Sequence, residues 1–497
     1  MLFYSYQFFI FLPAVLLLYF VIPRKCRAVW LLIASYVFYA CFSVKALLIL
    51  LAVTAASYFT GIRLEQLQGK EAEKKKKRFV FWAGAGTVLA VLFLFKYTGF
   101  FLESLNMVTG RFGAAPLSLP FSLILPAGIS YFTFQMISYL ADIYMGKIQA
   151  EHNFLYYALY ISFFPKIIVG PIERADFLNQ IRACSSFSLW DFGRITEGIS
   201  RMAWGYFEKL VIADRLSLLT GTVFSDYQSF GSTELFVAAA AFYIQLYADF
   251  AGCIDMAAGM AKIMGFKLTE NFRAPFFAKT VREYWARWHL SLGTWLRDYV
   301  YIPLGGNRKG TLKRYRNLMI TFFVSGIWHG AAWHFIMWGL LQGICEIGDD
   351  IARPIITKVN NKLHTKTESF GYRLVRTVKC WLVVCFTIVV FKMPTVRDGF
   401  QYLWRMFTRW NPWALFDGSL YTLGITEKYM HVVIVAVIIL LLVDWLKYKR
   451  ELTFDCWLSA QCIWFQYIVL LGCILAAVLL GAYGPSYSAE NFIYFQF

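Results

Sequence analysis

The stretch "YMHVVIVAVIILLLVDWL" (residues 429–446) contains a single acidic residue, Asp444, and is otherwise almost entirely apolar. An α-helix needs roughly 20 predominantly apolar residues to cross the hydrocarbon core of a bilayer, because each residue adds only about 1.5 Å along the axis. A helix packed inside a soluble protein usually keeps a polar face instead. The length and composition of this stretch therefore predict a helix that spans a membrane.

The same pattern recurs along the chain. Hydrophobic residues make up 59% of the 497 residues and charged residues 16%, and the mean hydropathy is +0.54. Apolar runs lie near 4–22, 28–60 (two short helices broken around Ser43 to Lys45), 79–102, 117–145, 153–170, 203–220, 235–264, 318–346, 379–393, 429–446 and 463–484. In lipid the backbone must satisfy its hydrogen bonds internally, which helices and closed β-barrels achieve. The sequence lacks the alternating strands that are typical of a membrane β-barrel. We expect one all-α domain over 1–497, a polytopic bundle of about ten to twelve membrane helices.

The charge distribution predicts how the chain crosses the membrane. Lys plus Arg number 48 and Asp plus Glu number 30, a formal net charge of +18, which in a soluble protein could indicate binding to nucleic acid. Here the basic residues gather in short loops between apolar runs, at 22–27, 69–78, 305–317 and 447–450. Such loops are typically retained in the cytoplasm. We therefore expect no nucleic-acid partner, a location in the plasma membrane, and both chain ends on its extracytoplasmic side.

The sequence lacks the motifs of two common kinds of hydrolytic site, which excludes both. The sequence has no H-E-x-x-H, no G-x-S-x-G and no C-x-x-C, although it contains ten cysteines. Zinc protease and serine hydrolase chemistry need the first two patterns. The cysteines are expected to be small buried hydrophobes. We expect no metal site and no bound cofactor.

His329 is the first candidate catalytic residue. It lies in "TFFVSGIWHGAAWHFIMWGLLQG" (321–343), where three glycines, Gly326, Gly330 and Gly339, would allow helices to approach closely. Ionisable groups at membrane depth are costly and therefore often functional. A histidine with a pKa near 6.5 can accept a proton from a hydroxyl as that hydroxyl attacks an acyl carbonyl. The alternative is a packing residue that bonds a carbonyl group.

His289 is the second candidate. It lies in "VREYWARWHLSLGTWLRDYVYIPLGG" (281–306), and on a helix it would share one face with Trp285 and Leu292. Three arginines would spread around the same axis: Arg282, Arg287 and Arg297. This pattern favours an amphipathic helix at the cytoplasmic surface rather than a full span. The alternative role is an aromatic and basic anchor in the membrane interface.

Several stretches resemble one known family. The sequence "ARWHLSLGTWLRDYVYIPLGGNRKG" (286–310), followed by "SGIWHGAAWHFIMWG" (325–339), is similar to the membrane-bound O-acyltransferase (MBOAT) family. The similar branch is the bacterial one of alginate O-acetyltransferase membrane subunits and D-alanyl-lipoteichoic acid transferases. The resemblance extends through four further stretches: "MLFYSYQFFIFLPAVLLLYFVIP" (1–23), "LPAGISYFTFQMISYLADIYMGKI" (125–148), "FFPKIIVGPIERADFLNQI" (163–181) and "YADFAGCIDMAAGMAKIMGFKLTENFRAPF" (247–276).

The resemblance implies a ring of helices around a central tunnel, with His329 as the catalytic histidine and His289 nearer the cytoplasmic entrance. It implies O-acylation of a cell-envelope or secreted polysaccharide, with the acyl group taken from acetyl-CoA or an acyl carrier thioester. D-alanyl transfer to teichoic acid is the alternative within the family. Members often carry histidine where this chain has Gln342, which puts a ligand-orienting role there in doubt.

A different class, a transporter or channel without chemistry, would instead use acidic residues to line a path. The candidates are Asp249, Asp255 and Glu270. Asp249 and Asp255 would fall on different faces of a helix, and transporters usually carry internal repeats that this chain lacks. These observations favour the enzyme.

Two kinds of partner follow from the enzyme hypothesis, besides membrane lipid. Arg282, Arg287 and Arg297, with Arg308 and Lys309, could bind the phosphates of CoA or the acidic surface of a carrier protein, although cytoplasmic loops are basic in any case. Beyond the membrane the chain has no segment large enough to hold a polysaccharide. We therefore expect an extracytoplasmic SGNH-type transferase to pass the acyl group to the glycan.

The last residues, "NFIYFQF" (491–497), add a further candidate. Phe492, Tyr494 and Phe497 form F-x-Y-x-x-F, which resembles the C-terminal motif of a small membrane peptide that works with D-alanyl transferases. That resemblance implies that Tyr494 carries the acyl group as an aryl ester after His329 activates its phenol. The alternative is an aromatic anchor in the membrane interface.

Overall fold

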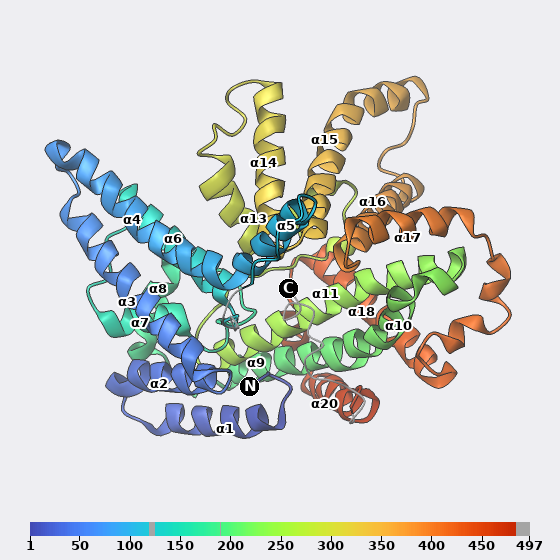
Figure 1. Ribbon diagram of the computed structural model, residues 1–497. Coiled ribbons are helices and arrows are strands. Elements are labelled where there is room, and N and C mark those ends of the chain that lie inside the picture. Colours follow the sequence, from blue (N-terminus) through green and yellow to red (C-terminus); the bar gives the residue numbers. More distant parts are fainter. Residues whose placement is uncertain (119–124, 189, 484–497) are drawn as a thin grey trace. The chain divides into compact units, whose positions relative to one another are not determined.

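The computed structural model describes residues 1–118, 125–188 and 190–483 (Figure 1). The described residues form helices joined by turns and loops, without a β-strand. This confirms the all-α prediction. The chain divides into two compact units, the first made of Met1–Ile199 and Ala257–Thr269 and the second of Ser200–Met256 and the chain from Glu270 onward. The expectation of one domain over 1–497 stays a prediction.

The first unit contains the N-terminal helices. They are α1 (Tyr6–Val21), α2 (Arg27–Ala40), α3 (Val44–Gln66), α4 (Lys74–Leu92), α5 (Thr98–Gly110), α6 (Ile129–Tyr144), α7 (Phe154–Ser162) and α8 (Asp176–Ala183). The predicted break in the run 28–60 is confirmed, because α2 ends at Ala40 and Ser43 begins α3. The Ser43 backbone is extended, and its hydroxyl accepts a hydrogen bond from the Ala46 amide, as an N-cap residue does.

The second unit contains both histidine segments. Its helices are the end of α9 (Phe192–Tyr206), α10 (Asp214–Ser225), most of α11 (Ser232–Ile263), α12 (Val281–Trp285), α13 (Leu290–Leu296), α14 (Thr311–His329), α15 (Trp333–Lys362), α16 (Phe370–Lys392), α17 (Val396–Thr408), α18 (Glu427–Arg450), α19 (Phe454–Ser459) and α20 (Ile463–Leu480). Two π-helical segments continue α9 and α13, η5 (Phe207–Ala213) and η8 (Arg297–Tyr301). Trp204, Phe242, Tyr247 and Trp288 belong to its buried aromatic core.

Six helical segments of the described chain are long and apolar enough to cross a membrane, judged by length and composition. They are Val44–Gln66, Lys74–Gly110, Ser232–Ile263, Phe370–Lys392, Glu427–Arg450 and Ile463–Leu480. Several other predicted runs form shorter or broken helices. The run 153–170 contributes only the helix Phe154–Ser162, and the run 318–346 is interrupted after His329. The chain is thus a multi-pass membrane protein in which some apolar segments are too short to span the bilayer alone, because burial among other helices also demands apolar residues.

Candidate active site

The helices α14 and α15 form a hairpin within the second unit (Figure 1). His329 is the residue at which α14 ends. The two helices approach so closely that a Cβ atom on Gly326 would lie 2.5 Å from the Phe335 carbonyl oxygen, and one on Gly339 would lie 2.4 Å from that of Phe322. Only glycine fits at either position. This close approach was expected from the glycine spacing and is confirmed. His329, the last residue of α14, is 6% exposed.

His289 lies in a different backbone context from the one predicted. The sequence suggested one amphipathic helix through this segment, but α12 ends at Trp285 and α13 begins at Leu290. Between them, His289 adopts a left-handed conformation with φ 47° and ψ 53°, which interrupts a right-handed helix. The side chain is only 1% exposed, so His289 is not an anchor at the water interface.

The fold brings the two histidines together. Their ring centroids are 6.5 Å apart, and the ring of Trp328 lies 5.6 Å from His289 and 5.0 Å from His329. Trp338 lies 5.0 Å from His329, and Phe250 lies 4.8 Å from His289. The aromatic rings exclude water from this pair, which strengthens electrostatic interactions with a reacting group.

Burial determines the protonation state of His289. It lies outside the six candidate spans, and removal from water lowers its pKa from 6.5 to about 3. Apolar surroundings disfavour the charged imidazolium. Neither ring nitrogen of His289 forms a hydrogen bond with the part of the chain that the structure describes. The imidazole is therefore neutral at physiological pH and has an acceptor nitrogen for a reacting group.

A cavity of about 420 Å³ is lined by His289, one of the two histidines. His289 lines it together with Trp285, and α14 contributes one face, Leu318, Thr321, Phe322 and Ser325. Ser325 lies one helical turn before His329, so this face extends from the basic end of α14 toward the second histidine. The surface that the lining residues expose to the cavity is mostly apolar.

The predicted arginines separate into two groups. Arg282 and Arg297 line the cavity of His289. Arg282 lies 3.3 Å from Glu346, and Arg297 lies 2.9 Å from Asp298. Arg287 instead lines a second cavity of about 490 Å³. There it pairs with Glu283 at 3.0 Å, so the structure does not place it beside the other two.

The remaining basic candidates and Gln342 have simpler surroundings. Arg308 and Lys309 are exposed and line neither of these cavities. Gln342 accepts a hydrogen bond from the indole nitrogen of Trp285 at 3.3 Å and donates one to the Thr387 hydroxyl at 2.8 Å. It thereby connects α12, α15 and α16 beside the cavity.

Sequence reasoning missed Asn271, which holds the His289 turn in place. Asn271 is fully buried, its carbonyl oxygen accepts from the Leu290 amide at 3.1 Å, and its Oδ1 accepts from the Ser291 amide at 3.0 Å. The one available signal was its position in "TENFRAPF" (269–276), where Asn271 lies between Glu270 and Phe272. That signal alone does not indicate what the side chain contacts.

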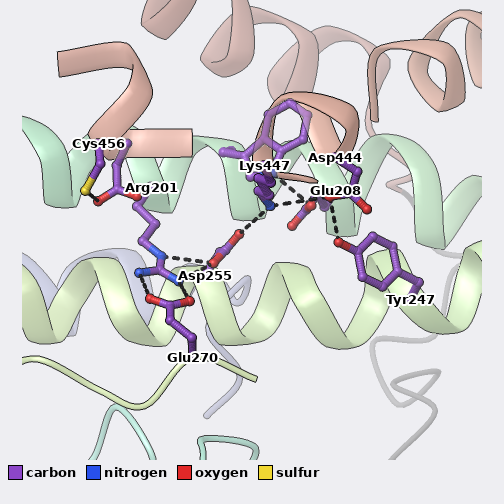
Figure 2. Close-up of polar contacts among 10 residues, drawn as sticks. Arg201, Glu208, Tyr247, Asp255, Glu270, Asp444, Lys447 and Cys456 are labelled. Carbon is purple, nitrogen blue, oxygen red and sulfur yellow. Dashed lines mark hydrogen bonds and ion pairs between the residues drawn. The ribbon is translucent and has the colours of Figure 1, made fainter. Parts of the chain in front are cut away.

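A buried ion network lies next to this segment, and Figure 2 shows Arg201 between two carboxylates. Arg201 donates to Asp255 at 2.8 and 2.9 Å and to both oxygens of Glu270 at 2.6 and 2.7 Å. Lys447 lies 4.0 Å from Asp255. Asp249 instead pairs with Lys209 at 2.7 Å. The acidic residues that a transport path would need are therefore held in two separate ion clusters.

Tyr494 lies outside the described residues, as do Phe492 and Phe497. The last described segment is fixed to its own unit. Arg215 donates to the carbonyl oxygens of Leu480 at 3.1 Å and Gly481 at 2.8 Å, and the Ala482 amide donates to the Leu210 carbonyl oxygen at 3.1 Å.

Comparison with known proteins gives a family and its members. Residues 31–393 match the model of the membrane-bound O-acyltransferase family. The chain is 36% identical to the probable alginate O-acetylase AlgI of Pseudomonas aeruginosa over 403 residues, which cover 80% of this chain and 72% of that protein. It is 35% identical to the peptidoglycan O-acetyltransferase of Helicobacter pylori over 367 residues, 68% of each chain.

A more distant relative comes from the D-alanyl branch. The chain is 28% identical to the teichoic acid D-alanyltransferase of Bacillus subtilis over 309 residues, which cover 59% of this chain and 74% of that protein. The family model covers both segments that carry the buried histidines. The protein is therefore an acyltransferase, and it belongs to the membrane-bound O-acyltransferase family.

Proposed function

We propose that this protein takes an acetyl group from a cytoplasmic thioester and delivers it across the membrane for O-acetylation of a cell-envelope or secreted polysaccharide. The observation that carries this proposal is the pair of buried histidines, of which His289 lines a cavity and His329 lies beside it. A base beside a bound thioester needs no further activating group, because the thioester is already reactive and binding holds it in position for attack.

In the proposed reaction, His329 accepts the proton of the acceptor hydroxyl as its oxygen attacks the thioester carbonyl. The new C–O bond forms, the C–S bond breaks, and the proton passes to the departing sulfur. The products are an ester and a free thiol. His289 faces the donor cavity, where it grips the donor or relays the proton to the sulfur.

Acetyl is favoured over D-alanyl as the group transferred. The relatives named for O-acetylation are 34–39% identical over most of the chain, whereas the teichoic acid D-alanyltransferase of Bacillus subtilis is 28% identical over a shorter region. A channel without chemistry has no comparable support.

We favour coenzyme A as the donor. A third cavity of about 380 Å³ shares Arg282 and Glu346 with the cavity of His289. Several further basic side chains line this third cavity: Lys279, Arg353, Arg373 and Arg376. Arginine is well suited to phosphate oxygens because its guanidinium can form two parallel hydrogen bonds. A nucleotide bound there would leave its pantetheine arm free to enter the apolar cavity.

Beyond the membrane, we propose two steps. Tyr494 receives the acetyl group as an aryl ester, which remains activated because the phenolate is a good leaving group. An extracytoplasmic SGNH-type partner then moves the group to the polysaccharide. Both chain ends lie outside in this scheme, since the basic loops at 22–27 and 447–450 are cytoplasmic.

The test uses purified protein in liposomes with acetyl-CoA labelled in its acetyl carbon. Wild-type protein is expected to release free CoA and to become labelled, and the His329→Ala protein is expected to do neither. D-alanyl carrier protein as the only active donor would instead support the teichoic acid alternative. Ion flux across the liposome membrane without consumption of the acetyl donor would support the alternative of a channel without chemistry.

A further inference from the structure

His289 is oriented without help from its own ring nitrogens. A catalytic histidine is usually held by a hydrogen bond from the nitrogen that does not react. In the described part of the chain neither nitrogen of His289 has such a partner. The ring is held instead by its backbone and by edge-to-face packing against Phe250 and Trp328.

That backbone is in a conformation that non-glycine residues rarely adopt. The left-handed φ of 47° at His289 is unfavourable for a residue with a Cβ atom, so neighbouring contacts must maintain it. Such contacts flank the residue on both sides. Asn271 accepts from the amides of Leu290 and Ser291, and the Arg273 amide donates to the Arg287 carbonyl oxygen at 3.0 Å. Residues 271–273 therefore brace the turn that contains His289.

Residues 271–273, which we call the brace, are themselves fixed to the bundle by the preceding residue, Glu270. Glu270 receives two parallel hydrogen bonds from Arg201 on α9, at 2.6 and 2.7 Å. The same guanidinium is held by Asp255 on α11, and its side chain is only 8% exposed (Figure 2). A bidentate pair between a guanidinium and a carboxylate fixes geometry as well as charge. Arg201 thus joins two long helices to the segment that braces His289.

We propose that Asn271 and Glu270, anchored by Arg201, are positioning residues that hold His289 in its reactive orientation. This inference rests on the proposed function, because it assigns His289 a part in the transfer. A displacement of about 1 Å in a reacting group can cost a hundredfold in rate. Loss of the brace should therefore reduce the transfer rate although no member of the brace touches the substrate.

The first experiment compares three variants in liposomes. Asn271→Leu keeps the size of the side chain and removes the acceptor for the Ser291 amide, and Glu270→Gln removes the charge paired with Arg201. Gln245→Leu is the matched control, since Gln245 is a buried amide that accepts from Thr220 at 2.6 Å and has no bond to the brace. We expect both brace variants to lose at least tenfold in rate, in the same parameter that His289→Ala changes, kcat or the KM for acetyl-CoA. The control should stay near wild type.

A double-mutant cycle then separates positioning from general damage. In a His289→Ala background, Asn271→Leu should cause little further loss, because the residue through which it acts is already gone. The same multiplicative loss in both backgrounds would overturn the inference.

A readout without catalysis tests the brace alone. Diethyl pyrocarbonate modifies neutral exposed imidazoles, and mass spectrometry of the His289 peptide should show faster modification in Asn271→Leu than in the wild type or in Gln245→Leu. Unchanged modification of His289 would overturn the brace even if activity falls. A His289→Ala protein with wild-type transfer would instead contradict the proposed role of His289, whatever the modification shows.

Discussion

His289 and His329 lie with their ring centroids 6.5 Å apart, although one directly precedes α13 and the other ends α14. The indole of Trp328 contacts both rings. Two imidazoles at this separation, enclosed by aromatic side chains, can contact opposite sides of one small reacting group. The predictions that follow depend on this arrangement.

Replacement of His329 by alanine should remove the general base. We expect a loss of about a hundredfold or more in acetyl transfer, the usual contribution of a positioned base. The KM for acetyl-CoA should change little, because His329 faces the acceptor side in the proposed reaction. Initial rates over a range of acetyl-CoA concentrations give both values, and size-exclusion elution checks the fold. Near wild-type transfer by a folded variant would show that another group is the base.

Replacement of His289 by alanine should affect the donor side. Because His289 lines the donor cavity, we expect a severe loss of rate together with weaker binding of acetyl-CoA. Binding of a non-hydrolysable acetyl-CoA analogue, measured by calorimetry, separates the two effects. Unchanged affinity combined with an unchanged rate would return His289 to a packing role.

The arginines should divide as their cavities do. Arg282→Gln and Arg297→Gln are expected to raise the KM for acetyl-CoA about three- to tenfold, a modest effect because both side chains are more than half exposed. Arg287→Gln should raise it less, since Arg287 lines the other cavity. Arg450→Gln, at the exposed end of α18, is the control for cytoplasmic charge alone. Equal effects on the KM at all four positions would indicate a general electrostatic attraction by cytoplasmic positive charge rather than a specific binding site for acetyl-CoA.

The buried neutral state of His289 predicts a pH dependence of stability. Its pKa is about 3 in the folded protein and about 6.5 when unfolded, so below pH 6.5 the unfolded chain binds a proton that the folded chain does not. Stability should therefore fall as the pH falls from 6.5 toward 3, by up to about 1.4 kcal/mol per pH unit from this group. Thermal unfolding in detergent at pH 7.5 and 5.0 should show a smaller acid shift for His289→Gln than for the wild type. An equal shift in both would place the acid sensitivity elsewhere.

The tail prediction concerns Tyr494, which lies outside the described residues. Tyr494→Phe keeps the ring and deletes the hydroxyl, so an acyl relay should fail while the membrane anchor persists. Mass spectrometry of the C-terminal peptide should find an acetyl group on wild-type Tyr494 after incubation with acetyl-CoA. If the peptide carries no adduct and the variant acetylates the polymer normally, the tail is an anchor only.

Three features of this protein were determined by the sequence alone. Apolar run lengths predicted an all-α membrane protein, because the bilayer constrains backbone hydrogen bonding so strongly that composition is nearly sufficient. The glycines at 326, 330 and 339 predicted a close approach of helices, and the structure shows it between α14 and α15 at Gly326 and Gly339. The motifs around His289 and His329 predicted the family, which the comparisons confirm.

Tertiary structure decided the rest of the site, because it depends on contacts between segments far apart in the chain. Periodicity suggested a continuous helix through His289, whereas Asn271, from another segment, holds a left-handed turn there. Local patterns carry no information about such a partner. For the same reason, three arginines that looked equivalent line two different cavities, and Asp255 and Glu270 turn out to share Arg201. Apolar runs alone did not separate long candidate spans from shorter buried helices, because a helix buried in protein and one buried in lipid need the same apolar residues.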